Sequence, residues 1–235
     1  MNLRVIGCHG RYPIAGGCSI GYVVEHEGKS LLMDCGSGVL GALLKLCDPS
    51  SLEAVLLSHL HFDHASDLLV LRYYLEYVKK TLPLYLPPED HSPFRSLLES
   101  PAFDLRPFPE KLSLMGLSVT TLPVIHPVPT RAIRLTDGQK TLVYTGDTND
   151  CPALPAFSRD ADVLLADAAF LSGEWSEKLP HMSAAGAASL AVQAGAKRLY
   201  LTHLPADHAP ETLEKEARAI FPDARAAYPG MVIAL

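Results

Sequence analysis

The run from Ser58 to His64 (SHLHFDH) is the feature that most restricts how this chain can fold. Within six residues it places three histidines and one aspartate, namely His59, His61, Asp63 and His64. Imidazole nitrogen and carboxylate oxygen are the ligands that zinc and similar divalent metals select. An apolar run typical of a buried strand precedes these residues, and a helical pattern follows them. The sequence therefore predicts a metal-binding loop between a strand and a helix, and not a solvated cluster of surface histidines.

The composition allows a large hydrophobic core. The chain has 235 residues, of which 48% are hydrophobic, so it can form one large domain or two small ones. We expect a single domain over residues 1–235. A stretch of about 18 apolar residues is lacking, so we expect no membrane-spanning helix and no membrane partner. Residues 1–7 lead into Gly, Cys and His too early for a signal peptide, which favours a cytoplasmic protein.

Charge and cysteine content bear on the partner and on the compartment. The formal net charge is −6, and Lys and Arg are scattered along the chain. Because long polyanions usually bind a basic stripe, this pattern favours a small substrate. The five cysteines are odd in number and lack CxxC spacing, which indicates reduced thiols. Cys35 follows Asp34 at the end of a predicted strand, where it can either pack in the core or reach a metal.

Short strands and helices follow one another in the same order in each half of the chain. Strands are expected at 3–6, 22–26, 30–34, 54–58, 117–122, 132–135, 141–144, 163–166, 199–202 and 231–234. Helices are expected at 39–47, 65–80, 92–100, 184–194 and 210–221, with Ser183 and Gly195 as the caps of the fourth. Hairpin turns are expected at 25–29 and 137–139. Antiparallel hairpins followed by β-α units predict two packed sheets with helices outside them, and not a doubly wound nucleotide-binding fold.

The helical segment 67–78 is apolar on nearly every side. A helix of this kind needs cover on more than one face. Two explanations stay open at this point. The helix is either deeply buried in the monomer or part of a subunit interface, where tyrosine is favoured.

Three further ligand-type residues follow short predicted strands. They are His126, Asp147 and His203. A strand end delivers such a side chain to the rim of its sheet. One of these residues alone would more often be a capping residue. Three of them, in the same chain as the loop from Ser58 to His64, predict a larger metal centre.

These residues, in this order, resemble the ligand set of the metallo-β-lactamase superfamily, and the resemblance covers essentially the whole chain. It implies an α+β fold, the four-layer αββα sandwich, with a dinuclear centre at one edge of the two sheets. By this resemblance His59, His61 and His126 hold one metal, Asp63, His64 and His203 hold the other, and Asp147 bridges both. Asp34 is similar to an early aspartate of the family that supports the metal loop by hydrogen bonds.

Within the superfamily, the chain is most similar to the phosphodiesterase branch. That branch includes ribonuclease Z and the phosphoribosyl cyclic phosphate phosphodiesterases. The similarity rests on residues 126–131, 146–148, 181–188 and 194–203. Ribonuclease Z also carries a long Gly-, Pro- and Lys-rich arm that grips tRNA. This sequence has no such insertion. The segment 151–180 is short, acidic and apolar, so a tRNA substrate is less expected.

The resemblance implies a function and its residues. We expect a dinuclear metal-dependent hydrolase in which a metal-activated hydroxide attacks a small phosphodiester or nucleotide-like substrate. His181 and Asp63 are the candidate catalytic residues, and His181 would protonate the leaving group. Zinc suits the ligands, although manganese or iron can also occupy such sites. The family also implies a homodimer.

Three alternatives compete with this expectation. One is a tRNA 3′-processing endonuclease, and another is a thioester or lactone hydrolase that uses the same hydroxide on a carbonyl. The third is a non-catalytic scaffold. It is disfavoured because every ligand position is filled by a residue able to bind a metal.

Overall fold

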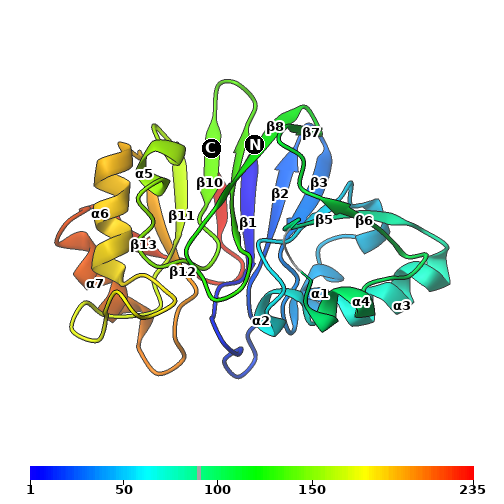
Figure 1. Cartoon of the computed structure of the whole chain (residues 1–235), viewed down its shortest axis with the longest axis horizontal. Coiled ribbons are helices and arrows are strands. Elements are labelled where there is room, and N and C mark those ends of the chain that lie inside the picture. Colours follow the sequence, from blue (N-terminus) through cyan, green and yellow to red (C-terminus); the bar gives the residue numbers. More distant parts are fainter. Residues whose placement is uncertain (89–90) are drawn as a thin grey trace. The chain divides into compact units, whose positions relative to one another are not determined.

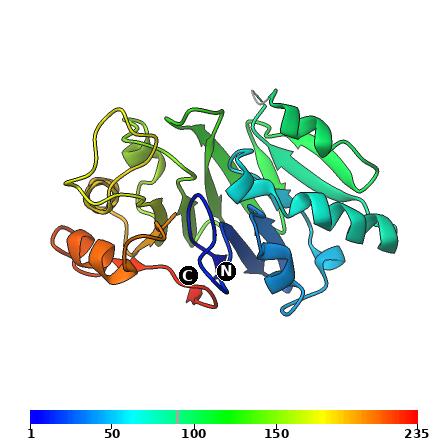
Figure 2. The ribbon, with the colours of Figure 1, turned by 90° about the horizontal axis from the view of Figure 1, so that it is seen from below.

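The computed structural model describes residues 1–88 and 91–235 (Figures 1 and 2). These residues form two compact units. Unit 1 contains Met1–Pro109 and Tyr228–Ala234, and unit 2 contains Glu110–Ala227 together with Leu235. Within the described residues, each unit has one seven-stranded mixed sheet with its own helices. A single domain over residues 1–235 stays a prediction.

The sheet of unit 1 is antiparallel on one side and parallel on the other. In spatial order its strands are β14 (Val232–Ala234), β1 (Asn2–Gly7), β2 (Gly21–His26), β3 (Lys29–Met33), β4 (Val55–Leu56), β5 (Leu82–Leu86) and β6 (Phe103–Pro107). The pairs from β14 to β3 are antiparallel, and those from β3 to β6 are parallel. The predicted order, hairpins first and β-α units second, is confirmed for this half of the chain.

The helices of unit 1 share one hydrophobic core with a face of this sheet. They are α1 (Val39–Leu43), the short 3₁₀ turn η1 (Pro49–Ser51), α2 (Phe62–Ala65), α3 (Leu68–Val78) and α4 (Pro93–Leu97). Leu32 and Val55 of the strands belong to the same buried cluster as Leu43 of α1 and Leu71 of α3. Burying each such side chain contributes about 1.5–3 kcal/mol. This packing holds the segment between β4 and α3 in place.

The helix expected at 65–80 is observed as α3, which begins three residues later and ends two residues earlier, and the short helix α2 before it was not expected. α2 ends at Ala65, and α3 begins at Leu68. Between them, the carboxylate of Asp67 accepts the N–H of Leu40 at 2.9 Å, and the N–H of Asp67 donates to the carbonyl of Cys35. These contacts come from residues far away in the sequence, so local periodicity could not predict the break.

Only one side of α3 is buried. Leu68, Leu71 and Leu75 face the core, whereas Tyr73 and Tyr77 are exposed, Tyr77 by 85%. The explanation that the whole helix is buried in the monomer is therefore wrong.

Along the chain, unit 2 repeats the strand arrangement of unit 1, with antiparallel pairs first and parallel pairs second. Its strands, in spatial order, are β13 (Arg225–Ala226), β12 (Leu199–Thr202), β11 (Val163–Asp167), β10 (Thr141–Tyr144), β9 (Arg131–Thr136), β8 (Leu117–Pro123) and β7 (Leu112–Leu114). The pairs from β7 to β10 are antiparallel, and those from β10 to β13 are parallel. The carboxyl ends of β10, β11 and β12 therefore lie at one edge of this sheet.

Three helices accompany the sheet of unit 2: α5 (Leu154–Phe157), α6 (Ala184–Ala194) and α7 (Pro210–Arg218). α6 contacts β11 and β12 and lies beside α7 in both views (Figures 1 and 2). Its predicted caps are confirmed. Ser183 Oγ accepts the N–H of Gly186 at 3.0 Å, and Gly195 takes the left-handed conformation, with φ of 64°. In residues 1–88 and 91–235, no helix combines the length and the apolar character that crossing a membrane requires.

Two glycines of unit 1 provide a matched test of this packing. A Cβ atom on Gly36, which follows β3, would lie 1.8 Å from the carbonyl oxygen of Asp63, whereas one on Gly41, inside α1, would meet nothing within 4 Å. Gly36→Ala should therefore lower the free energy of unfolding by about 1–3 kcal/mol. Gly41→Ala should leave it unchanged or raise it by up to about 1 kcal/mol. Urea denaturation measures both, and equal effects of the two substitutions would contradict the close approach at Gly36.

Candidate metal centre

In unit 1, the histidine-rich loop is anchored to a buried carboxylate. Asp34 directly follows β3, is fully buried and has φ of 56°, a left-handed conformation that is uncommon for aspartate. Its Oδ1 accepts the N–H of Ser58 at 2.7 Å, and its Oδ2 accepts the Ser58 hydroxyl at 2.7 Å. Oδ2 also accepts Nδ1–H of His64 at 2.8 Å. One side chain thus holds both the start and the end of the loop.

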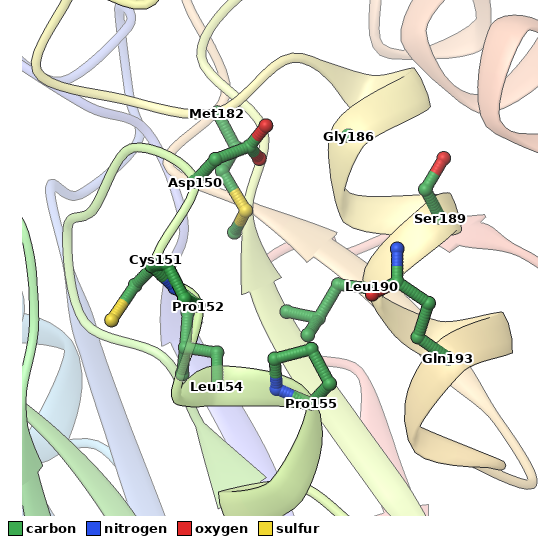
Figure 3. A pocket seen from close by; sticks show the side chains of 10 residues that line it. All are labelled: Asp150, Cys151, Pro152, Leu154, Pro155, Met182, Gly186, Ser189, Leu190 and Gln193. Atoms are coloured by element: carbon green, nitrogen blue, oxygen red, sulfur yellow. The ribbon is translucent and has the colours of Figure 1, made fainter.

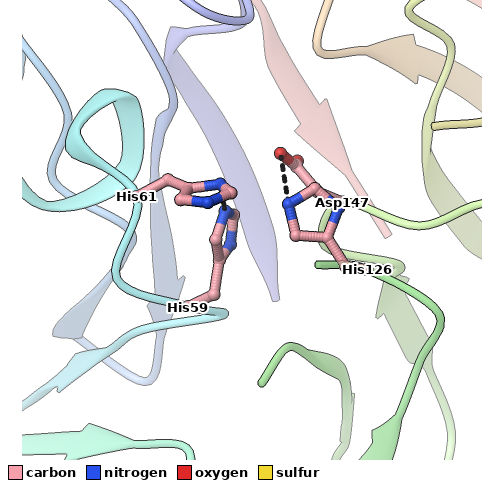
Figure 4. A group of neighbouring side chains, drawn as sticks. All are labelled: His59, His61, His126 and Asp147. Atoms are coloured by element: carbon pink, nitrogen blue, oxygen red, sulfur yellow. Dashed lines mark hydrogen bonds and ion pairs between the residues drawn. The ribbon is translucent and has the colours of Figure 1, made fainter. Parts of the chain in front are cut away.

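These hydrogen bonds determine which ring nitrogens face the loop interior. Because Nδ1 of His64 donates to Asp34, Nε2 of His64 carries the lone pair that can bind a metal. The Ser58 hydroxyl gives its hydrogen to Asp34, so Nδ1 of His59, 3.0 Å away, donates to that oxygen. Nε2 of His59 then carries the lone pair. It lies 3.1 Å from Nδ1 of His61 (Figure 4).

That separation suits two ligands of one cation. Two nitrogens that each lie 2.0–2.1 Å from a tetrahedral zinc ion are about 3.3 Å apart. Asp63, next to these histidines in the loop, accepts the N–H of Arg11 on Oδ2 at 2.7 Å, and the same oxygen lies 3.8 Å from Nε2 of His64. The loop therefore brings nitrogen and oxygen donors of unit 1 together in a fixed arrangement.

In unit 2, three histidines surround one carboxylate oxygen. Asp147 follows β10 and is 2% exposed. Its Oδ2 lies 3.1 Å from Nε2 of His203, 3.9 Å from Nδ1 of His181 and 4.0 Å from Nε2 of His126. Figure 4 marks the last of these pairs. Asp147, His181 and His203 form a group whose ligand atoms all lie within 4.8 Å of one another.

A second buried aspartate of unit 2, Asp167, was not predicted. It is the last residue of β11 and is fully buried. Its Oδ2 accepts the N–H of Thr148 at 2.9 Å and Nδ1–H of His181 at 2.8 Å. Its Oδ1 lies 3.9 Å from Nδ1 of His203. The strand expected at 163–166 stops one residue short of it, although an aspartate at the carboxyl end of a parallel strand was a usable signal.

The ring of His181 is held by contacts on several sides. Since Nδ1 donates to Asp167, Nε2 carries the lone pair or the second proton. The ring stacks on that of His203 with centroids 4.4 Å apart, and it lies 5.2 Å from the ring of His126. Nδ1 of His126 in turn donates to the carbonyl of Pro180 at 3.1 Å, so Nε2 of His126 faces Asp147 with its lone pair.

Cys35 is a packed thiol. It is fully buried and belongs to the hydrophobic core of unit 1. Burial raises the pKa of its thiol well above the ordinary value, and the negative charges of Asp67 and Asp34 add to this shift. All five cysteines lie within the described residues, and all are free thiols.

A cavity of about 450 Å³ lies in unit 2 between α5 and α6 (Figure 3). Met182 and Leu190 point into it, and Asp150 and Gln193 add polar groups. Met182 lines the cavity although its neighbour His181 turns its ring to Asp167. None of the predicted metal ligands lines this cavity, so it is separate from the cluster around Asp147.

The donor atoms fit a divalent metal. Unit 1 supplies His59, His61, Asp63 and His64 supported by Asp34, and unit 2 supplies His126, Asp147, His203 and His181 supported by Asp167. Nitrogen from imidazole and oxygen from carboxylate suit zinc, manganese or iron. The His/Asp cluster is able to bind metal.

Comparison with known proteins decides the family. A family model described as "Beta-lactamase superfamily domain" matches residues 17–204, which is most of the chain. The chain belongs to the β-lactamase superfamily. A relative in Bacillus subtilis, "Probable metallo-hydrolase YhfI", is 36% identical over 230 residues, which is 94% of each chain. The crystal structure of YhfI matches 99% of this chain and 98% of its own, with a TM-score of 0.94 and 35% identity.

More distant superfamily members share the fold. Human tRNase Z, short form, matches all of this chain and 99% of its own at a TM-score of 0.81 with 18% identity. A diphosphatase from the PhnP family gives a TM-score of 0.79 with 19% identity, over 100% and 97% of the two chains. The predicted fold class, the α+β fold of the metallo-β-lactamases, is confirmed. The chain is a metal-dependent hydrolase of this superfamily, as predicted.

The contacts of Asp167 give a prediction about stability. Asp167→Ala would leave a buried N–H on Thr148 and remove the acceptor for His181, so the free energy of unfolding should fall by about 1–3 kcal/mol. Denaturation in the presence of a chelator measures this loss without any contribution from metal binding. Asp207→Ala, at an exposed aspartate after β12, should stay within about 0.5 kcal/mol of the unsubstituted protein. Equal stability of the two variants would show that Asp167 does not organise the site.

Proposed function

We propose that this chain is a dinuclear phosphodiesterase that acts on a small phosphodiester or nucleotide-like substrate. The observation that carries the proposal is the pairing of His181 with the buried carboxylate of Asp167, among metal-type ligands. This pairing provides a proton donor in addition to a metal site, which suits cleavage of a phosphodiester whose leaving group is an alkoxide. The relatives named ribonuclease Z and the structure from the PhnP family favour phosphorus chemistry.

The proposed assignment of ligands uses residues of both units. His59, His61 and His126 would hold one cation, Asp63, His64 and His203 would hold the other, and Asp147 would serve both. Zinc suits these donors, although manganese or iron can replace it. When bound, two such cations would lower the pKa of a water molecule toward about 7 and neutralise the negative charge of a phosphodiester. The solved structure of zinc-bound PqqB from Methylobacterium extorquens has the same fold.

The chain's own residues then handle the proton. Asp167 accepts Nδ1–H of His181 and stabilises the protonated ring, so Nε2–H can be given to the departing alkoxide. Stacking on His203 fixes the plane of the ring. Asp63 is the second candidate catalytic residue, and the N–H of Arg11 orients its carboxylate. In the alternative arrangement, His181 is itself a metal ligand together with Asp147 and His203.

A ribonuclease role on tRNA is the second candidate function. A protein named ribonuclease Z from Methanosarcina acetivorans is 22% identical over 286 residues, covering 94% of this chain and 93% of its own. The net charge of −6 argues against a long polyanionic partner. Salt-sensitive RNA binding in a gel-shift assay would favour this second candidate.

We also propose that the partner protein is a second copy of this chain. The exposed side of α3 presents Val70, Tyr73 and Tyr77, with Phe62 of α2 exposed by 70% nearby in the sequence. Aromatic side chains are enriched at protein interfaces. Light scattering would give the mass of a dimer, and Tyr77→Glu should shift the equilibrium toward the monomer.

The substrate class is tested with three kinds of compound. We expect turnover of bis(p-nitrophenyl) phosphate after loading with zinc or manganese, and little turnover of thioesters or lactones. The reverse preference would replace the phosphodiesterase proposal by carbonyl hydrolysis. No turnover of any compound, by a protein that carries metal, would revive the scaffold alternative.

The role of His181 is tested by His181→Ala. If the ring is a proton donor, kcat on an alkyl phosphodiester should fall by about 10²–10⁴-fold, while the metal content stays near that of the unsubstituted protein. His208→Ala is the control, because His208 is paired with Glu174 on a surface loop and is not among the residues proposed to bind metal or to move the proton. Loss of metal in His181→Ala would instead make His181 a ligand.

A further inference from the structure

The segment that carries His181 is tied to the chain's one tryptophan. Trp175 lies between β11 and α6, in a stretch where most side chains from residue 172 to 178 are exposed. Its indole Nε1–H lies 3.0 Å from the carbonyl oxygen of His181 and 3.1 Å from Oδ1 of Asn149. The indole therefore contacts the backbone of His181, whereas Asp167 contacts its ring.

Asn149 uses the full hydrogen-bonding capacity of its amide. The side chain is buried, with 3% of the residue exposed. Its Nδ2 donates to the carbonyls of Ser176 and Leu179, and its Oδ1 accepts from Trp175 and from the N–H of Asp150. An amide offers two donor hydrogens and two acceptor lone pairs, so all four are satisfied. A carboxylate of the same size would lack both donors.

The same residue connects the segments that carry His126, Asp147 and His181. Asn149 follows Asp147 by two positions, and its backbone N–H donates to the carbonyl of Ile125, the residue before His126. Its side chain holds Leu179, next to Pro180, whose carbonyl accepts Nδ1–H of His126. A substitution at Asn149 would therefore alter the hydrogen bonds that hold the loops around the cluster.

We propose that Asn149 and Trp175 are positioning residues that fix the backbone of His181, so that its ring can point Nε2 at the leaving group. We name this pair the Asn149–Trp175 brace. Asp167 holds only the ring, and a ring can follow a displaced backbone. The brace holds the backbone of His181 through its carbonyl oxygen. The inference deepens the proposed function and rests on it for the kinetic effect.

A positioning role for a proton donor predicts a dependence on the leaving group. An alkoxide needs a proton as it departs, whereas p-nitrophenolate departs as a stable anion. The p-nitrophenyl and methyl esters of thymidine 5′-phosphate form a matched pair of substrates. In Asn149→Asp and Trp175→Phe, kcat for the methyl ester should fall by about 10–100-fold, as for other residues that orient a catalytic group. For the p-nitrophenyl ester, kcat should stay within about threefold, and KM should change little for either ester.

Two control variants separate this effect from general loosening. Asn2→Asp makes the same chemical change in β1 of unit 1, at a residue that is not part of the brace. Glu174→Gln weakens the contact between Glu174 and His208 in the surface loop without touching the indole. Both variants should keep the ratio of the two kcat values found for the unsubstituted protein.

Nuclear magnetic resonance of the metal-free protein gives a second readout that does not need activity. The single tryptophan yields one indole N–H signal, which should exchange slowly with solvent because its hydrogen is bonded. Asn149→Asp should speed this exchange and shift the ring signals of His181, identified by their loss in His181→Ala. Asn2→Asp should change neither.

The outcomes are decisive in each case. Equal loss of kcat on both esters, or no loss on either, would overturn the positioning role. Fast indole exchange in the unsubstituted protein would show that the brace does not exist. If the unsubstituted protein cleaves neither ester, the proposed function fails, and the spectra alone decide the brace. Unchanged His181 ring signals in Asn149→Asp would then overturn it.

Discussion

The arrangement of the candidate ligands depends on two aspartates that are fully buried, Asp34 in unit 1 and Asp167 in unit 2. A buried carboxylate is stable only when hydrogen bonds replace the lost water. Each aspartate lies at the carboxyl end of a strand and accepts a backbone N–H from the loop after a neighbouring strand, Ser58 in one unit and Thr148 in the other. Each also accepts Nδ1–H of an imidazole. The imidazoles concerned belong to His64 and His181. The same device thus orders the site loop of each unit.

This device orients the rings before any metal or substrate binds. When Nδ1 donates to a fixed acceptor, Nε2 is directed away from that acceptor and keeps its lone pair or its second proton. Backbone strain accompanies the arrangement. Asp34 and His203 take left-handed conformations, with φ of 56° and 55°, and each costs on the order of 1–3 kcal/mol. The packing and hydrogen bonds around both residues offset that cost. The fold thus tolerates a loss of stability at these two positions, which places the two side chains in the site.

Much of this could be predicted from the sequence, because the signals are local. The strand, loop and helix around Ser58–His64, the caps of α6 and the order of hairpins and β-α units all follow from short patterns. The missing parts depend on distant contacts. The break between α2 and α3 depends on the hydrogen bond between Asp67 and Leu40. The strand β5 was not expected because it contains Pro83, and proline disfavours a strand in the interior of a sheet. The position of Asp167 at the end of an apolar run is a usable signal, but an aspartate there is also typical of a turn, and its bond to His181 depends on a residue 14 positions away.

Metal content per chain tests the proposed dinuclear centre most directly. Protein loaded with zinc and separated from excess metal should carry about two zinc ions per chain, measured by plasma mass spectrometry. Asp147→Ala should carry fewer than about one, because the proposal gives both cations the same carboxylate, while Asp207→Ala should keep about two. An unsubstituted protein that takes up no zinc, or an Asp147→Ala variant that retains about two ions, would contradict the proposed centre.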